Sequence, residues 1–108
     1  MKKGTSLYLE DILEMINRIE KSTRNLTKSE FFENLDSQDM TIRRLEIIGE
    51  AVKQIPGEFK TKYPKIPWRE IAGTRDILIH AYAGANLDRI WMIIQKDLKP
   101  LKNKLKSS

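Results

Sequence analysis

The sequence contains no cysteine and only one histidine, His80. Without cysteine there can be no disulfide, no thiolate nucleophile and no thiolate-bound metal. A zinc site is not expected either, because such sites usually combine several nitrogen or sulfur ligands. We therefore expect a protein that uses no metal ion and no other cofactor, and its composition is compatible with a reducing compartment.

Long apolar segments are also absent, since no run approaches the roughly 18 residues of a membrane span. The first residues contain Glu10, Asp11 and Glu14 where a signal peptide needs an unbroken hydrophobic stretch. We expect a cytoplasmic protein that does not associate with membranes. Its 108 residues leave room for one domain, with a core at about 6–98 and a basic tail at about 99–108.

Basic residues outnumber acidic ones by 20 to 15, which gives a net charge of +5. Part of the excess lies near the end of the chain. Such a charge either favours an anionic partner or only maintains solubility. The terminal lysines fit a solvated helix face better than a phosphate-binding patch, although both interpretations stay open. They are Lys96, Lys99, Lys102, Lys104 and Lys106.

Apolar residues recur at helical spacing along almost the whole chain, which predicts an all-α, up-and-down four-helix bundle with one extra short helical turn. We expect helices at about 6–22, 37–55, 67–84 and 86–98. Ser6 is the expected N-cap of the first helix, and Thr27 with Glu30 matches a capping box before the short turn. Gly49 indicates a close helix crossing, and Pro100 is expected to kink or end the last regular helix.

The segment Arg75–Tyr82, RDILIHAY, places ionisable groups within an apolar helical pattern. Asp76 and His80 are four residues apart and face the same way on a helix, so the carboxylate can orient the imidazole for proton transfer. Arg75 has the donors to hold a phosphate. These groups supply the base and the phosphate-binding cation of metal-independent RNA cleavage. The leaving oxygen also needs a proton donor, which a pair of chains with both copies of His80 in one cleft would provide. From spacing alone, however, a structural hydrogen bond between Asp76 and His80 is the commoner explanation.

The same segment resembles the Arg-x4-His-x-Tyr motif of HEPN-domain proteins, and of HepT-like toxins in particular. The resemblance extends to RRLEIIGEAVKQIP, FKTKYPKIPWREIAGTRD and NLDRIWMIIQKDLKPLK, and covers about residues 7–105. It implies a HEPN fold, a homodimer whose cleft holds both motifs, and ribonuclease activity without metal. It also implies an antitoxin, the MNT-type minimal nucleotidyltransferase, which transfers AMP to the motif tyrosine.

Carried over by motif position, the resemblance makes Arg75 the phosphate-binding cation, His80 the general acid/base and Tyr82 the adenylylation target. Asp76 lies where relatives usually have a polar residue, often Asn. An aspartate there supports His80 and raises its pKa, but it also places negative charge beside a phosphate.

Several other residues have two interpretations. Glu46 and Glu50 either face the cleft or are solvated carboxylates, and the second interpretation is favoured. Arg43 and Arg44 either touch RNA or are simply exposed. Core packing is favoured over base stacking for both tryptophans, Trp68 and Trp91.

Two other functions remain open. The chain could be a non-catalytic module that binds nucleotide or serves a nucleotidyltransferase as substrate and partner. A sequence-specific DNA-binding protein ranks last, because no helix-turn-helix spacing is found.

Overall fold

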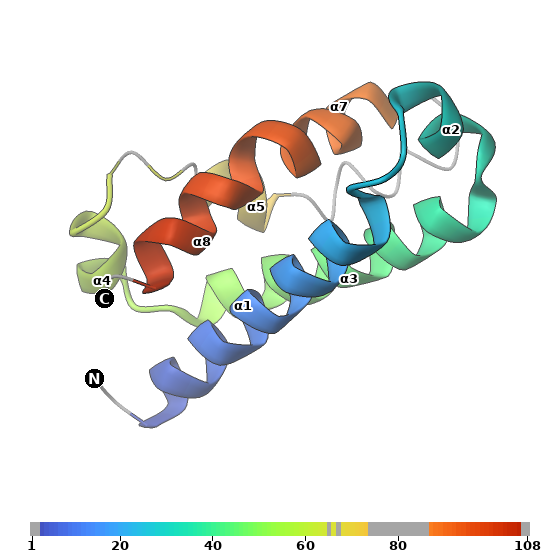
Figure 1. Cartoon of the computed structure of the whole chain (residues 1–108). Helices are drawn as coiled ribbons and strands as arrows, with labels where there is room; N and C mark the ends of the chain where they lie inside the picture. The colour runs from blue at the N-terminus through green and yellow to red at the C-terminus, as the bar shows by residue number, and fades with distance from the viewer. Residues whose placement is uncertain (1–2, 65, 67, 74–86, 107–108) are drawn as a thin grey trace.

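The computed structural model describes residues 3–64, 66, 68–73 and 87–106. These residues form helices and no strands, which confirms the predicted all-α class. Three long rods dominate: α1 (Lys3–Thr23), α3 (Leu35–Gln54) and the continuous run of α7 (Leu87–Met92), η1 (Ile93–Asp97) and α8 (Leu98–Lys106) (Figure 1). None of the described helices combines the length and apolarity that a membrane crossing requires.

Helix α1 begins at Lys3, so the predicted N-cap at Ser6 is wrong and Ser6 lies within the helix. No proline precedes the apolar stripe, so nothing stops the helix from extending by most of a turn. The stripe itself is as predicted, since Ile12, Ile16 and Ile19 are fully buried. At the C-terminal end, the buried Thr23 Oγ1 donates a hydrogen bond to the Ile19 carbonyl at 2.7 Å.

The capping box at Thr27 is confirmed. The Glu30 amide donates to Thr27 Oγ1 at 3.2 Å, the Thr27 amide donates to Glu30 Oε1 at 2.9 Å, and the short helix α2 (Lys28–Glu33) follows. The hydrogen bonds with Thr27 lower the pKa of the Glu30 carboxyl below its ordinary value. The hydrogen bond with the Thr27 backbone has the larger effect, and the one with its side chain has the smaller effect. The next helix, α3, begins at Leu35 because the Asn34 side chain accepts a hydrogen bond from the Ser37 amide at 3.0 Å.

Helix α3 packs along α1 and buries Leu45, Ile48 and Val52. It ends at Gln54, just before Pro56. A further short helix, α4 (Gly57–Thr61), follows where the sequence indicated only a connector. Its Phe59 is buried, with its ring centroid 5.3 Å from that of Tyr63.

The C-terminal rod passes Pro100 instead of ending near residue 98. The π-helical turn η1 lies immediately before α8, and the Leu98 amide donates to the Ile93 carbonyl five residues back. A proline in a helix crowds the carbonyl four residues earlier, here that of Lys96, and the wider turn gives this carbonyl room. Beyond the proline, Leu101 and Leu105 are buried and continue the apolar stripe of the rod.

Candidate functional site

The motif residues Arg75, Asp76, His80 and Tyr82 lie outside the described residues, as does most of the helix expected at 67–84. The roles assigned to them therefore stay predictions. The structure instead describes the elements that precede and follow residues 74–86, and a groove on the neighbouring face of α3.

Helix α5 (Trp68–Ala72) ends three residues before Arg75 and crosses α3 at Gly49. A Cβ atom at Gly49 would lie 3.2 Å from the carbonyl oxygen of Ile71 and 3.5 Å from that of Ala72. Only glycine therefore allows this approach without displacement of one backbone. The predicted close crossing at Gly49 is confirmed, and it fixes the chain just before the motif.

Trp68 holds α5 from its other end. Its indole is buried, and Nε1 donates a hydrogen bond to the Tyr63 carbonyl at 3.0 Å. The Phe59 ring meets the indole edge-on at 6.4 Å between centroids. This environment confirms the core-packing interpretation of Trp68.

Helix α7 follows residues 74–86 and is tied to α2 by two contacts. Lys28 Nζ forms an ion pair with Asp88 Oδ1 at 2.6 Å, and the ring centroids of Trp91 and Phe31 are 5.3 Å apart. Phe31 is fully buried and Trp91 is half-buried, which confirms core packing for the second tryptophan as well. Residues 74–86 therefore connect two segments that are both fixed to the bundle.

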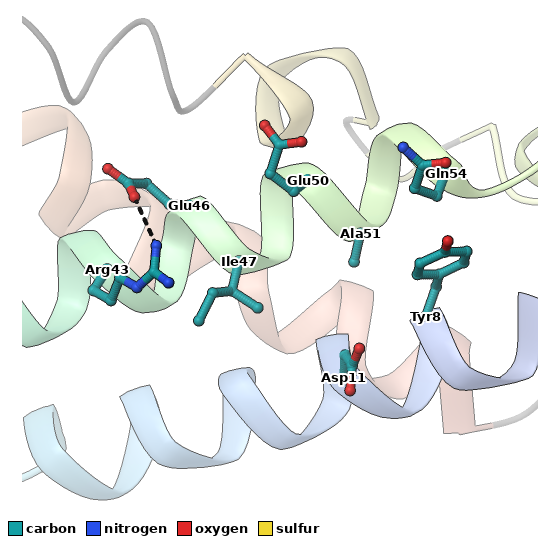
Figure 2. A pocket seen from close by; sticks show the side chains of 8 residues that line it. All are labelled: Tyr8, Asp11, Arg43, Glu46, Ile47, Glu50, Ala51 and Gln54. Atoms are coloured by element: carbon teal, nitrogen blue, oxygen red, sulfur yellow. Dashed lines mark hydrogen bonds and ion pairs between the residues drawn. The ribbon is translucent and has the colours of Figure 1, made fainter. Parts of the chain in front are cut away.

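An open groove of about 650 Å³ lies between α1 and α3 (Figure 2). Of the residues that line this groove, the sequence had indicated only Arg43, Glu46 and Glu50 as candidate functional residues. The contributions from α1 are far from α3 in sequence, so no local spacing could have shown that they share one surface. The lining consists of Tyr8, Asp11, Arg43, Glu46, Ile47, Glu50, Ala51 and Gln54.

The charges of this groove are mostly negative. Three carboxylates and one guanidinium line it, and Arg43 Nη1 forms an ion pair with Glu46 Oε2 at 3.3 Å. The Glu50 carboxylate, whose side chain is 53% exposed, lies 3.9 Å from Lys53 Nζ. With Lys53 included, the groove has only a small net negative charge, which does not favour a phosphate.

The neighbouring Arg44 has a structural role. Its Nη1 donates hydrogen bonds to the Arg18 carbonyl and to Ser22 Oγ, both at 3.1 Å, and its side chain is half-buried. Arg44 thus fastens α3 to the C-terminal part of α1. In the described part of the chain, no three His, Asp or Glu side chains are arranged to hold a metal ion. The expectation of a metal-free site stays a prediction, because the motif lies elsewhere.

The described helices define an all-α bundle of the HEPN-like class. The sequence profile of the family described as "Ribonuclease HepT-like" matches residues 12–108, nearly the whole chain. The chain therefore belongs to the HepT-like ribonuclease family.

Two relatives illustrate the range of proteins in which this domain occurs. The "Probable ribonuclease HepT" of Thermococcus cleftensis is 47% identical over 104 residues, which cover 96% of this chain and 94% of that protein. A Methanocaldococcus jannaschii protein named "Gamma-glutamylcyclotransferase and putative RNase" is 47% identical over 105 residues. These residues cover 97% of this chain but only 47% of that longer protein, so the chain spans about half its length. No solved structure matches the chain significantly.

Proposed function

We propose that this chain is a metal-independent endoribonuclease and the toxin of a toxin–antitoxin pair. One observation carries the proposal: a chain of the HepT-like ribonuclease family contains Arg75, His80 and Tyr82 at the spacing of the HEPN motif. The names of its relatives agree with ribonuclease activity. A cytoplasmic location follows from the proposed substrate, which is cellular RNA.

The proposed chemistry is attack by the RNA on itself. His80, in its neutral form, takes the proton of a ribose 2′-hydroxyl, and the 2′-oxygen forms a bond to the adjacent phosphorus. The bond from phosphorus to the 5′-oxygen breaks, and that oxygen receives a proton. Arg75 stabilises the charge that develops on the phosphoryl oxygens, and Asp76 orients the His80 ring. The expected products carry a 2′,3′-cyclic phosphate and a 5′-hydroxyl.

A homodimer supplies both proton-transfer groups. Because the chain has a single histidine, one subunit alone has no second imidazole to protonate the leaving oxygen. Two chains that place both copies of His80 in one cleft provide a base and an acid together. This arrangement makes assembly a condition for activity rather than only a source of stability.

The antitoxin we propose is a minimal nucleotidyltransferase of the MNT type. The Tyr82 phenol oxygen attacks the α-phosphorus of ATP, pyrophosphate leaves, and AMP remains on the tyrosine. A phosphodiester two residues from His80 adds bulk and negative charge where RNA must bind, and so blocks the site.

The decisive experiment is cleavage of total cellular RNA by the purified protein in the presence of a chelator, after its intact mass has shown that Tyr82 is unmodified. We expect cleavage by the wild type and by Asn17→Ala, an exposed control substitution on α1, but not by His80→Ala or Arg75→Gln. Circular dichroism and sedimentation establish that each variant is folded and assembled like the wild type. Equal cleavage by wild type and His80→Ala would disprove the proposed site.

If no variant cleaves RNA, the chain is instead a non-catalytic partner or substrate of the transferase. Incubation with an MNT-type enzyme and ATP tests the modification separately. We expect the mass of one AMP or more to be added to the wild type and to Tyr63→Phe, but not to Tyr82→Phe. Addition of AMP to the Tyr82→Phe variant would place the modification elsewhere.

A further inference from the structure

The positive charge of the chain is concentrated on its C-terminal rod. Residues 87–106 contain six basic and two acidic side chains, a net charge of +4 out of the total of +5. In contrast, α1 and α3 each contain three basic and four acidic side chains. The bundle therefore has one cationic rod beside a weakly acidic pair of helices.

Three lysines of this rod face the solvent on one side of the helix. Lys96, Lys99 and Lys106 are three and seven residues apart, spacings that keep side chains on one face, and the exposed Asn103 lies between them. They span about 15 Å along the helix axis. We define these three side chains as the α8 lysine face.

The cations of the α8 lysine face differ from four cations of the other described helices, although the exposed Lys21 and Arg24 resemble the face in having no ion pair there. Arg18, Lys28, Arg43 and Lys53 each lie within ion-pair distance of a carboxylate. In the part of the chain that the structure describes, no ion pair involves Lys96, Lys99 or Lys106. Their ammonium groups are therefore available to an anion from outside.

Helix stability explains only part of this pattern. Cations in the last turn of a helix interact favourably with its dipole, and this accounts for Lys104 and Lys106. Lys96 and Lys99 precede the last turn, so the dipole gives no reason for their charge.

The lysine face is also held in place. Leu98 and Leu101, on the opposite side of α8, are fully buried. Lys102 Nζ forms an ion pair with Glu20 Oε1 of α1 at 2.7 Å, and both side chains are mostly buried. The helix that carries the face is thus fixed to the bundle rather than frayed.

We propose that the α8 lysine face binds the phosphate backbone of RNA outside the catalytic motif. This inference rests on the proposed ribonuclease function and adds a second contact surface for its substrate. Lysine contacts to phosphates do not read bases, so the face contributes affinity and not sequence preference.

The test measures binding separately from cleavage. The probe is a fluorescein-labelled, single-stranded 2′-O-methyl RNA of mixed sequence, which lacks the 2′-hydroxyl that cleavage requires. Its affinity is measured over a range of salt concentrations for the wild type, K96Q/K99Q/K106Q and the charge-preserving K96R/K99R/K106R. The matched control is K21Q/R24Q/K28Q, which removes three exposed cations from the α1–α2 corner.

We expect the triple glutamine variant to bind at least about tenfold more weakly at roughly 100 mM salt. The slope of log affinity against log salt should fall by about 2, since each phosphate contact on a single strand contributes about 0.7. The arginine variant should bind like the wild type, and the corner control should lose much less. On cleavable RNA, the glutamine variant should show a raised KM and an unchanged kcat.

Equal binding by the glutamine variant and the wild type would overturn the proposal. Equal losses in the α8 and corner variants would overturn it too, because total charge would then explain the binding. If the wild type binds the probe through α8 but cleaves no RNA, the ribonuclease proposal fails while this one holds.

Discussion

Gly49 of α3 lies against the backbone of α5, so that a Cβ atom added to it would stand 3.2 Å from the carbonyl oxygen of Ile71. This contact determines how closely the two helices approach, three to four residues before the motif begins. It also explains a glycine in the middle of a long helix, where glycine costs about 1 kcal/mol relative to alanine.

Gly49→Ala should therefore affect activity more than stability. The gain in helix propensity and the tight contact oppose each other, so we expect the free energy of unfolding to change by less than about 1 kcal/mol. Displacement of α5 should lower the rate of RNA cleavage several-fold. Gly49→Val, whose branched side chain needs more room, should be destabilised by about 1–3 kcal/mol.

The matched control is Gly57→Ala, because no atom lies within 4 Å of a Cβ at that position. Thermal unfolding and cleavage rates of the three variants check the prediction. Full activity in Gly49→Ala, together with unchanged stability in Gly49→Val, would show that the crossing can relax and positions nothing.

The two adjacent arginines of α3 should behave differently. Arg44→Gln removes two hydrogen bonds that join α3 to α1, and we expect a loss of about 1–2 kcal/mol in the free energy of unfolding. Arg43→Gln removes an exposed ion pair and should cost less than about 1 kcal/mol. Urea denaturation of both variants tests this ranking, which a larger loss in Arg43→Gln would contradict.

The capping box should make stability depend on the protonation of Glu30. Because the folded state lowers the pKa of this carboxyl, its contribution is fully present above the unfolded pKa and is lost as the pH falls through the folded value. Wild type should thus be more stable than Glu30→Ala at pH 7, and the difference should shrink below about pH 4.5, the ordinary value for glutamate. Denaturant midpoints of both proteins over this pH range measure the effect, and a difference that is independent of pH would refute it.

The indole of Trp68 should contribute through its hydrogen bond as well as its volume. Trp68→Phe leaves the Tyr63 carbonyl without its donor and a smaller ring in the core, so we expect a loss of about 1–3 kcal/mol. Tyr63→Phe keeps that carbonyl in place and should be nearly neutral. Chemical denaturation followed by circular dichroism compares the two variants. Equal stabilities of Trp68→Phe and Tyr63→Phe would show that the indole hydrogen bond does not contribute.

The proposed composite site requires a dimer at the concentrations at which the enzyme acts. We expect sedimentation velocity at micromolar protein to show a species of twice the chain mass, and specific activity to fall on dilution below the dissociation constant. A monomer that retains full specific activity would exclude a cleft built from two chains.

Patterns within a single helix predicted much of this fold. The buried stripes of α1 and α3, the capping box at Thr27 and the tight approach at Gly49 all follow from the sequence. Each depends on residues no more than a few turns apart, or on one residue type with a narrow steric use. The helix boundaries were less accurate, because Ser6 and Asn34 are both good caps and only the packed structure shows which one caps a helix.

Features that depend on tertiary packing were missed. The turn η1 lets the rod pass Pro100, since burial of Leu101 and Leu105 favours continuing the helix over ending it. Helix α4 forms where Phe59 packs beside Trp68, a contact between separate elements. The groove between α1 and α3 was not predicted for the same reason, because it also depends on contacts between separate elements. The catalytic roles rest on the motif and the family alone.

The separation of charge between α8 and the α1–α3 pair gives the molecule an electric dipole moment, with its positive end at α8. A polyanion that diffuses toward it is attracted to the lysine face and repelled by the weakly acidic groove over a distance of about 8–10 Å at physiological salt. Encounters are then oriented before any contact forms, and the association rate should fall steeply as ionic strength rises. The fold would thus act on the approach of the proposed RNA substrate as well as on the complex with it.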